Sequence, residues 1–164
     1  IRDSKQLSPK KREDFYKIIT KHPAMKWGIG IVSEKVIDKI NILEATKLAM
    51  IKAVKNLKTK RGHPKIDYLI LDGNIKLDTK ILQKSIVNAD QKVFSCATAS
   101  ILAKVTRDRI MEKLHKKYPE YGFNIHKGYP TKYHIEMLKK YGLCKIHRKS
   151  FGPVKIAQSL KRKA

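Results

Sequence analysis

The sequence has few acidic residues, few aromatic residues, two cysteines and no long apolar run. Its 14 Asp and Glu stand against 38 Lys and Arg, so the formal net charge is +24, which favours a polyanion as partner. Because no run approaches the roughly 18 apolar residues of a membrane span and no secretory signal is recognisable, we expect no membrane association. The spacing of Cys96 and Cys144 fits neither a disulfide framework nor a zinc motif, which favours buried thiols in a reduced, cytoplasmic setting.

The chain does contain enough apolar material for a core, and its charge is unevenly distributed. Hydrophobic residues make up 41% of the 164 residues, which fits a single folded domain, 1–164. No acid occurs between Glu44 and Asp67, whereas Asp72 and Asp90 lie in the least basic central part. Isolated carboxylates in a basic surround are typical of a protein that binds a nucleic-acid backbone and a metal ion. Nothing in the sequence demands an oligomer, so we expect a monomer.

Hydrophobic periodicity and turn residues predict alternating helices and strands, and therefore an α/β fold. Ser8 and Pro9 are typical of a helix start, and Thr131 is a suitable cap for a helix that Gly142 stops. Helices are predicted from 9 to before His22, at 41–57, at 95–117 and from 131, with a loop at 119–130 and a basic tail from 143. Strands are predicted at 27–32, 68–71 and 85–87. The glycines of the first strand weaken it or admit a close neighbour, and the second strand is expected to be buried on both faces.

Two aspartates follow the predicted strands of the central part. Asp72 ends one apolar strand just before a glycine, and Asp90 follows the next strand before a long helix. Asp72 has two equally favoured interpretations. It is a metal or substrate ligand at the carboxyl edge of an α/β sheet, or a turn residue whose side chain forms a hydrogen bond with its own backbone. Asp90 is open to the same choice, with a helix N-terminal charge as its alternative. Two such aspartates in a chain so poor in acids favour a hard cation, Mg²⁺ or Mn²⁺, shared with a substrate phosphate.

Seven stretches, in matching order over essentially the whole chain, resemble the ribonuclease HII family. They are DSKQLS (3–8), INILEATKLAM (40–50), LILDGN (69–74), NAD (88–90), ATASILAKVTRDRIMEKL (97–114), YPEYGFNIHKGYPTKYH (118–134) and HRKSFGPV (147–154). The resemblance implies a ribonuclease H-like mixed sheet flanked by helices, with a helical substrate-binding extension at 131–164. It also implies an endonuclease that hydrolyses the RNA strand of RNA–DNA hybrids and cleaves 5′ to ribonucleotides embedded in duplex DNA, using two Mn²⁺ or Mg²⁺ ions.

The same resemblance implies roles for individual residues. Asp72 and Asp90 match two of the four carboxylates that bind the catalytic ions. Tyr129 matches the tyrosine that packs on the sugar at an RNA-to-DNA junction. Five basic residues fall on family motifs and are expected to hold backbone phosphates: Lys5, Lys104, Arg107, Lys127 and Arg148.

The sequence departs from the family pattern in two places. Family members carry an Asp-Glu-Ala-Gly-Arg-Gly segment on the first, central strand, and this segment, which supplies the other two carboxylates, has no match here. Since the chain begins at Ile1, we expect a chain that is truncated at its N-terminus, lacks the central strand, and is inactive or impaired on its own. Asn88 stands where the family usually has Lys, a change that we interpret as tolerated.

Three functions follow from the sequence as alternatives. The first is the metal-dependent endoribonuclease of the resemblance. The second is a catalytically inactive, basic nucleic-acid-binding remnant that lacks the N-terminal Asp-Glu pair, and the third is a ribosome-associated basic protein whose acids are only turn residues.

Two further groups of residues have a simple structural interpretation. His126, His134 and His147 are either proton shuttles or packing groups, and packing is favoured because two-metal hydrolysis needs no dedicated histidine base. Residues 10–12, Lys-Lys-Arg, are most simply the exposed face of their helix.

Overall fold

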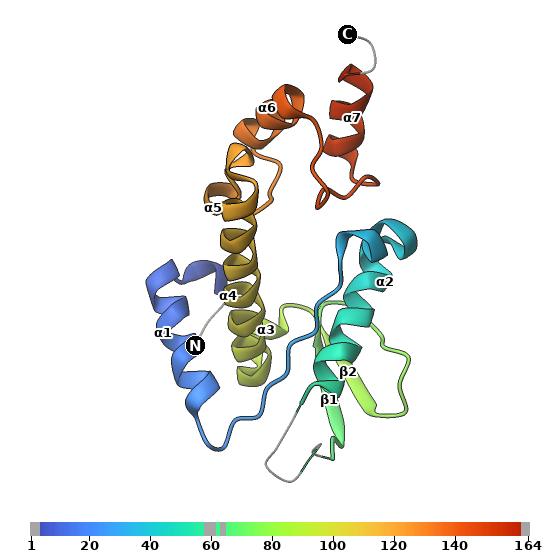
Figure 1. The fold of residues 1–164 in the computed structure, drawn as a ribbon. Coiled ribbons are helices and arrows are strands. Elements are labelled where there is room, and N and C mark those ends of the chain that lie inside the picture. Colours follow the sequence, from blue (N-terminus) through green and yellow to red (C-terminus); the bar gives the residue numbers. More distant parts are fainter. Residues whose placement is uncertain (1–3, 58–61, 63–64, 162–164) are drawn as a thin grey trace. The chain divides into compact units, whose positions relative to one another are not determined.

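The computed structural model describes residues 4–57, 62 and 65–161, and contacts between residues divide the chain into two compact units. The first unit comprises Ile1–Ile31 and Thr46–Val105, and the second comprises Val32–Ala45 and Thr106–Ala164. Two helices labelled in Figure 1, α2 (Glu34–Lys55) and α4 (Phe94–Lys117), belong in part to each unit. The single ribonuclease H-like domain over 1–164 stays a prediction.

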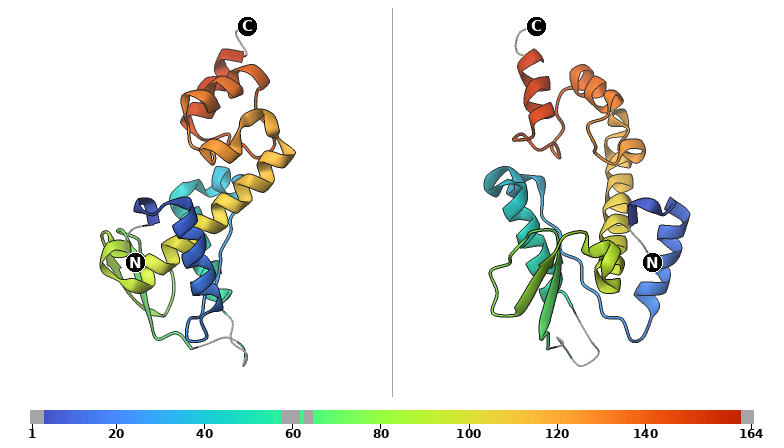
Figure 2. Two further views of the ribbon diagram at one scale, coloured as in Figure 1. Left: turned by 90° about the vertical axis from the view of Figure 1, so that its left-hand side faces the viewer. Right: turned by 180° about the vertical axis from the view of Figure 1, so that it is seen from behind.

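In the first unit, α1 (Pro9–Lys21) packs beside the first half of α4 (Figures 1 and 2). The predicted helix start is confirmed, because the Ser8 side chain accepts a hydrogen bond from the Lys11 amide at 3.3 Å and Pro9 opens the helix. A buried apolar cluster joins the two helices and comprises Ile19, Ile101, Leu102 and Val105. A short 3-10 helix, η1 (Ser4–Gln6), is tied to α4 by the Ser4 and Ser100 hydroxyls, whose oxygens are 2.7 Å apart.

The prediction that residues 10–12 are simply an exposed face is wrong for Arg12. Lys10 and Lys11 are exposed, but Arg12 is half-buried. Its Nη1 donates to the carbonyl oxygens of Ser4 at 3.1 Å and Leu7 at 2.5 Å. The guanidinium therefore satisfies backbone acceptors of the segment that enters α1, a task that a sequence pattern of three basic residues does not reveal.

The predicted strand at 27–32 is wrong, because these residues pair with no other strand in the described ranges. Their backbone lies against the C-terminal half of α2 instead. Asn56 Nδ2 donates to the carbonyl oxygen of Ile29 at 2.7 Å, and Lys52 Nζ donates to that of Ile31 at 3.3 Å. A side chain at Gly28 or Gly30 would collide with the α2 backbone, so the glycines serve the close approach that we had expected as one alternative.

The sheet of the first unit is a parallel pair, β1 (Tyr68–Asp72) and β2 (Leu82–Ile86), in the register Tyr68↔Leu82 to Asp72↔Ile86. Both strands were predicted, although β2 begins three residues earlier than expected. The expected burial of β1 on both faces is wrong: Leu71 is 6% exposed, but Tyr68 is 51% and Ile70 38% exposed. With two strands in the described ranges, one face of the pair is covered much better than the other.

Helix α2 contains a break at Asn41, whose backbone angles are φ 67° and ψ 170°. The Asn41 side-chain oxygen accepts hydrogen bonds from the amides of Leu43 at 2.9 Å and Glu44 at 3.1 Å, and so caps the helical segment that follows. The predicted helix start at 41 is therefore confirmed as a cap. The periodic pattern missed the shorter helical segment that precedes it, which begins at Glu34.

The second unit is helical around an aromatic core. Beyond the second half of α4 come η2 (Pro119–Tyr121), α5 (Phe123–His126), α6 (Lys132–Tyr141) and α7 (Gly152–Lys161) (Figure 2). The two short helices lie in the segment 119–130, for which the sequence predicts a loop. Each is a single turn that ends at a left-handed residue, and a single turn is too short for a periodic hydrophobic pattern to reveal it. The cap at Thr131 and the stop at Gly142 are confirmed. The buried core consists of Tyr121, Phe123, Leu138, Val154 and Ala157.

The α/β class is therefore confirmed, with a small parallel sheet and predominantly helical surroundings. Among the described residues, no helix is both long enough and apolar enough to cross a membrane.

Candidate active site and nucleic-acid interface

The carboxyl ends of β1 and β2 meet at one edge of the sheet, because parallel strands end on the same side. Asp72 is the last residue of β1 and pairs in register with Ile86, the last residue of β2. The Gly73 amide donates to the Ile86 carbonyl oxygen at 3.0 Å and holds the two strand ends together. Gly73 has φ 83°, a left-handed conformation that favours glycine and that turns the chain away after Asp72.

Asp90 comes to the same edge through a short helix, α3 (Ala89–Lys92), which follows β2. The Ala89 amide donates to Asp72 Oδ1 at 2.7 Å, so the residue just before Asp90 is bound directly to the Asp72 carboxylate. Burial raises the pKa of the Cys96 thiol, and the charges of Asp72 and Asp90 raise it further. Both carboxylates therefore lie within electrostatic range of one buried group.

Carboxylate oxygens are the ligands that Mg²⁺ and Mn²⁺ prefer, so the donor chemistry of this edge fits a hard divalent cation. Asp72 is exposed and Asp90 half-buried, which leaves the edge accessible to a substrate. Within the ranges that the structure describes, no group of three or more His, Cys, Asp or Glu side chains is arranged to hold a metal ion. The edge thus offers part of a ligand set built from two aspartates.

In the second unit, Tyr129 follows two residues with left-handed backbone, Lys127 (φ 48°) and Gly128 (φ 79°). The tyrosine side chain is 55% exposed, and the Arg107 guanidinium carbon lies 4.9 Å from the centre of its ring. Lys127 is not simply solvated, because its Nζ lies 2.9 Å from Glu112 Oε1 and its side chain is 19% exposed. The segment thus presents an aromatic ring with an arginine over it.

Arg148 lies in the same unit and is half-buried, with its guanidinium carbon 4.4 Å from the centre of the Phe151 ring. Burial lowers the pKa of this guanidinium, and the positive charge of Arg107 lowers it further. The negative charge of Asp38 raises the same pKa, but by less. The two arginines therefore concentrate positive charge in this unit, which attracts anions.

Asp38 supports the segment of Arg148, and sequence reasoning missed it. Its carboxylate accepts hydrogen bonds from the amides of Lys149 at 2.8 Å and Ser150 at 2.9 Å, and also from the Ser150 hydroxyl. The hydrogen bonds from Ser150 hold the pKa of Asp38 below its usual value. One aspartate thereby fixes the backbone next to Arg148. No local signal marks this contact, because its partners are more than 100 positions apart in sequence.

The three histidines of the second unit form a buried cluster. His126 and His134 are each 6% exposed and His147 7% exposed. The rings of His126 and His134 stack with centroids 4.2 Å apart, and the Nε2 atoms of His134 and His147 are 3.2 Å apart. Cys144, expected to be buried, is half-buried, with its Sγ 3.1 Å from His147 Nδ1. Buried rings with internal partners agree with the packing interpretation better than with proton shuttles to substrate.

Comparison with known proteins shows which family this chain resembles. A model of the family described as Ribonuclease HII matches residues 1–154. Ribonuclease HII of Chlamydia muridarum (strain MoPn / Nigg) is 49% identical over 155 residues, which are 94% of this chain and 69% of that protein. Ribonuclease HII of Bacillus cereus (strain Q1) is 51% identical over 155 residues, 94% of this chain and 58% of that protein. The chain belongs to the ribonuclease HII family.

A solved structure supports the same relationship at the level of the fold. The ribonuclease H2 of Pyrococcus horikoshii OT3 superposes with a TM-score of 0.77 at 27% sequence identity, over 99% of this chain and 82% of that one. The ribonuclease H-like fold predicted from the sequence motifs is therefore confirmed.

The residues expected from the ribonuclease HII resemblance are divided between the two units. The first contains Asp72, Asp90, Lys104 and Lys5, and the second contains Tyr129, Arg107, Lys127 and Arg148. Lys104 is half-buried on α4, and Lys5 belongs to η1, with its side chain outside the described part of the structure. Their roles toward a substrate stay predictions.

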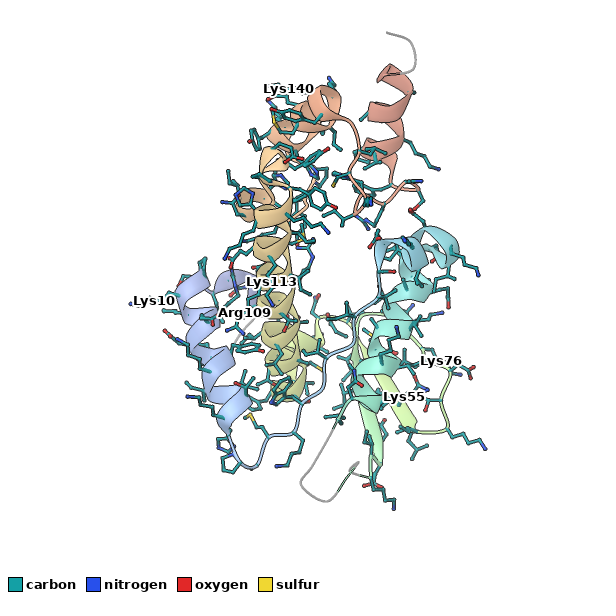
Figure 3. All side chains as sticks on the ribbon, viewed as in Figure 1. Lys10, Lys55, Lys76, Arg109, Lys113 and Lys140 are labelled. Atoms are coloured by element: carbon teal, nitrogen blue, oxygen red, sulfur yellow. The ribbon has the colours of Figure 1, made fainter. Side chains whose placement is uncertain are left out.

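Basic side chains are spread over the elements of this ribonuclease HII chain beyond these positions. Figure 3 shows Lys10 on α1 and Lys140 on α6 extending away from their helices, and both are exposed. The Lys140 ammonium also lies 5.0 Å from the centre of the Tyr141 ring. Such dispersed charge adds non-specific attraction for a polyanion without defining a site.

Proposed function

We propose that this chain acts as part of an endoribonuclease that hydrolyses the RNA strand of RNA–DNA hybrids and cleaves 5′ to ribonucleotides embedded in duplex DNA. The observation that carries the proposal is the 2.7 Å hydrogen bond from the Ala89 amide to Asp72 Oδ1, which brings the residue next to Asp90 to the carboxyl edge of the sheet. Membership of the ribonuclease HII family supports the reaction class. The substrate is a nucleic acid, as the formal net charge of +24 favours.

In this proposal Asp72 and Asp90 would supply two of the carboxylates that hold two divalent ions, Mn²⁺ or Mg²⁺, and the family's Asp-Glu pair would supply the others. When bound, such ions supply an activated water and stabilise the leaving 3′-oxygen. The residues of this chain bind the substrate. Arg107 and Arg148 hold backbone phosphates, assisted by Lys5, Lys104 and Lys127. Tyr129 packs on the sugar at the RNA-to-DNA junction, and the exposure of its ring supports that role.

The test is Asp72→Asn in a form of the protein that carries the family's Asp-Glu-Ala-Gly-Arg-Gly segment ahead of residue 1. We expect cleavage of a duplex with one embedded ribonucleotide, in Mg²⁺ or Mn²⁺, to fall by more than about 100-fold, because the variant has one ionic ligand fewer. Asp78→Asn, in the exposed connection between β1 and β2, is the matched control and should cleave normally. Retained cleavage by Asp72→Asn would remove this residue from the mechanism.

We propose a second function for the 164 residues by themselves: binding of nucleic acid without cleavage. The supporting observation is the ligand set, in which two carboxylates carry too little charge to balance two divalent ions. The measurement is binding and cleavage of the same labelled hybrid by the 164-residue chain. Metal-dependent turnover by this chain alone, or absence of binding, would contradict this second function, while the cleavage assay above judges the first.

A further inference from the structure

The backbone that carries Tyr129 has a conformation that needs support. Lys127 has φ 48° and ψ 34°, and Gly128 has φ 79°. Two consecutive left-handed residues are unusual, and the first is a lysine, whose Cβ disfavours that region. Something outside the segment must hold this geometry in place.

His126 supplies one support. Its Nε2 lies 2.7 Å from the carbonyl oxygen of Tyr121, which can only accept, so Nε2 carries the proton. Its Nδ1 is then an acceptor, and the Gly128 amide donates to it at 3.1 Å. The imidazole thereby fixes the Lys127–Gly128 peptide, one residue before Tyr129.

His134 supplies the other support, from α6. Its Nδ1 lies 2.9 Å from the carbonyl oxygen of Tyr129, so Nδ1 carries the proton. Its Nε2 must then accept, and the Nε2–H of His147 is the donor at 3.2 Å. The remaining nitrogen of His147, Nδ1, accepts from the Cys144 amide at 3.0 Å. One assignment of protons satisfies all three rings, and each ring is neutral in it.

The two supporting rings are also fixed against each other. They stack with centroids 4.2 Å apart and planes inclined by 14°, and the Phe123 ring packs edge-on against both, at 5.8 Å from His126 and 5.6 Å from His134. Both histidines are 6% exposed, whereas Tyr129 is 55% exposed. A rigid, buried pair therefore holds the backbone on both sides of an exposed aromatic side chain.

We propose that His126 and His134 are positioning residues that set the orientation of Tyr129 for packing on the sugar of a ribose–deoxyribose junction, an inference that rests on the proposed function. His126 holds the Gly128 amide and His134 holds the Tyr129 carbonyl, and neither ring contacts the substrate. The hydrogen bonds, more than the volume of the rings, carry this function.

The test compares two substitutions at one position. His134→Asn places an amide donor where Nδ1 was and keeps the bond to the Tyr129 carbonyl, whereas His134→Phe keeps the stacked ring and loses the bond. Affinities of the 164-residue chain are measured for a duplex with one ribose–deoxyribose junction and for the all-DNA duplex, without divalent ions so that no cleavage occurs. We expect a junction preference of about tenfold in the parent chain, from one stacking contact.

His134→Asn should keep this preference and His134→Phe should lose it, with binding to all-DNA duplex unchanged in both. A preference retained in His134→Phe, or lost equally in both variants, would overturn the positioning role in favour of packing alone. A parent chain without any junction preference overturns it as well, while the Asp72→Asn cleavage assay still judges the proposed function separately.

A second measurement needs no variant and therefore no assumption about folding. The ¹⁵N shifts of the imidazole nitrogens in the parent chain report which nitrogen of each ring carries the proton. We expect His126 and His147 protonated on Nε2 and His134 on Nδ1. The opposite tautomer of His134 would leave the Tyr129 carbonyl without its donor and would refute the proposal.

Discussion

Asn88 shows how a single residue departs from its family for a physical reason. It occupies a position with φ 57° and ψ 43°, in the left-handed region. Asparagine enters this region far more readily than lysine, which is the residue that we expected from the family pattern. The substitution therefore suits the turn that delivers Asp90 to the strand edge, and its interpretation as tolerated agrees with the backbone.

His147 leads to a prediction about pH. Burial, then the neighbouring His134 and His126, lower the pKa of His147 from 6.5 to about 4, and burial lowers that of His134 as well. Between pH 6.5 and pH 4 the unfolded chain binds more protons than the folded chain, so stability falls as pH falls through this window. We expect a loss of about 3 kcal/mol from His147, measured as the free energy of unfolding in urea at successive pH values.

The control is His147→Gln. This variant should be less stable at pH 7.5, because buried partners such as the Cys144 amide lose their acceptor. Its stability should then depend less on pH between 6.5 and 4 than that of the parent chain. An equally steep dependence in His147→Gln would show that other groups cause it.

At the scale of elements, the contact between residues 28–31 and α2 depends on the absence of side chains. A Cβ at Gly30 would overlap the backbone of Ala49 and Ala53. We expect Gly30→Ala to destabilise the chain by about 2 to 3 kcal/mol, because a backbone cannot move aside as a side chain can. The measurement is the midpoint and slope of urea unfolding.

Gly152→Ala is the matched control for this prediction. Gly152 begins α7, and a Cβ there meets no atom within 4 Å. Because a Cβ there displaces no atom, we expect the free energy of unfolding to change by less than about 1 kcal/mol. Equal effects of the two substitutions would mean that the close packing on α2 contributes nothing.

Elements with local signals could be predicted from the sequence, and elements that depend on distant partners could not. The start of α1 follows from Ser8, and the limits of α6 follow from Thr131 and Gly142, because caps act within one turn. The strand expected at 27–32 has the right composition, but a strand exists only when another strand pairs with it. The partial exposure of β1 likewise depends on how many strands surround it.

The candidate site divides in the same way. Asp72 and Asp90 could be proposed from the sequence because strand ends gather at one sheet edge. Asp38 and the histidine supports of Tyr129 could not, because their roles consist of hydrogen bonds to backbone atoms of other segments. Every residue has the same backbone N–H and C=O groups, so the residue types do not reveal which backbone atoms a side chain will bind.

For the whole molecule, the positive charge predicts how binding responds to salt. If the expected phosphate contacts act together, four or five of them give a slope of about −4 for log K against log salt concentration on duplex DNA. Arg148→Ala should reduce the slope by about 1 and weaken binding equally for all sequences. Fluorescence anisotropy at several salt concentrations measures both quantities.

Lys10→Ala is the control for the salt experiment, since Lys10 is exposed on α1 and belongs to none of the expected phosphate contacts (Figure 3). It should leave the slope within error of the parent value. If Lys10→Ala and Arg148→Ala reduce the slope equally, binding is diffuse and Arg148 holds no particular phosphate.

The short connection between β1 and β2 also has a consequence for the order of folding. Strand partners such as Tyr68 and Leu82 are close in the chain, and the bond between Asp72 and the Ala89 amide spans 17 positions. The contacts of Ser4 with Ser100 and of Asp38 with Ser150 span 96 and 112 positions. Since closing a short loop costs less entropy, we expect the two carboxylates to come together early and the segment of Arg148 to be fixed late.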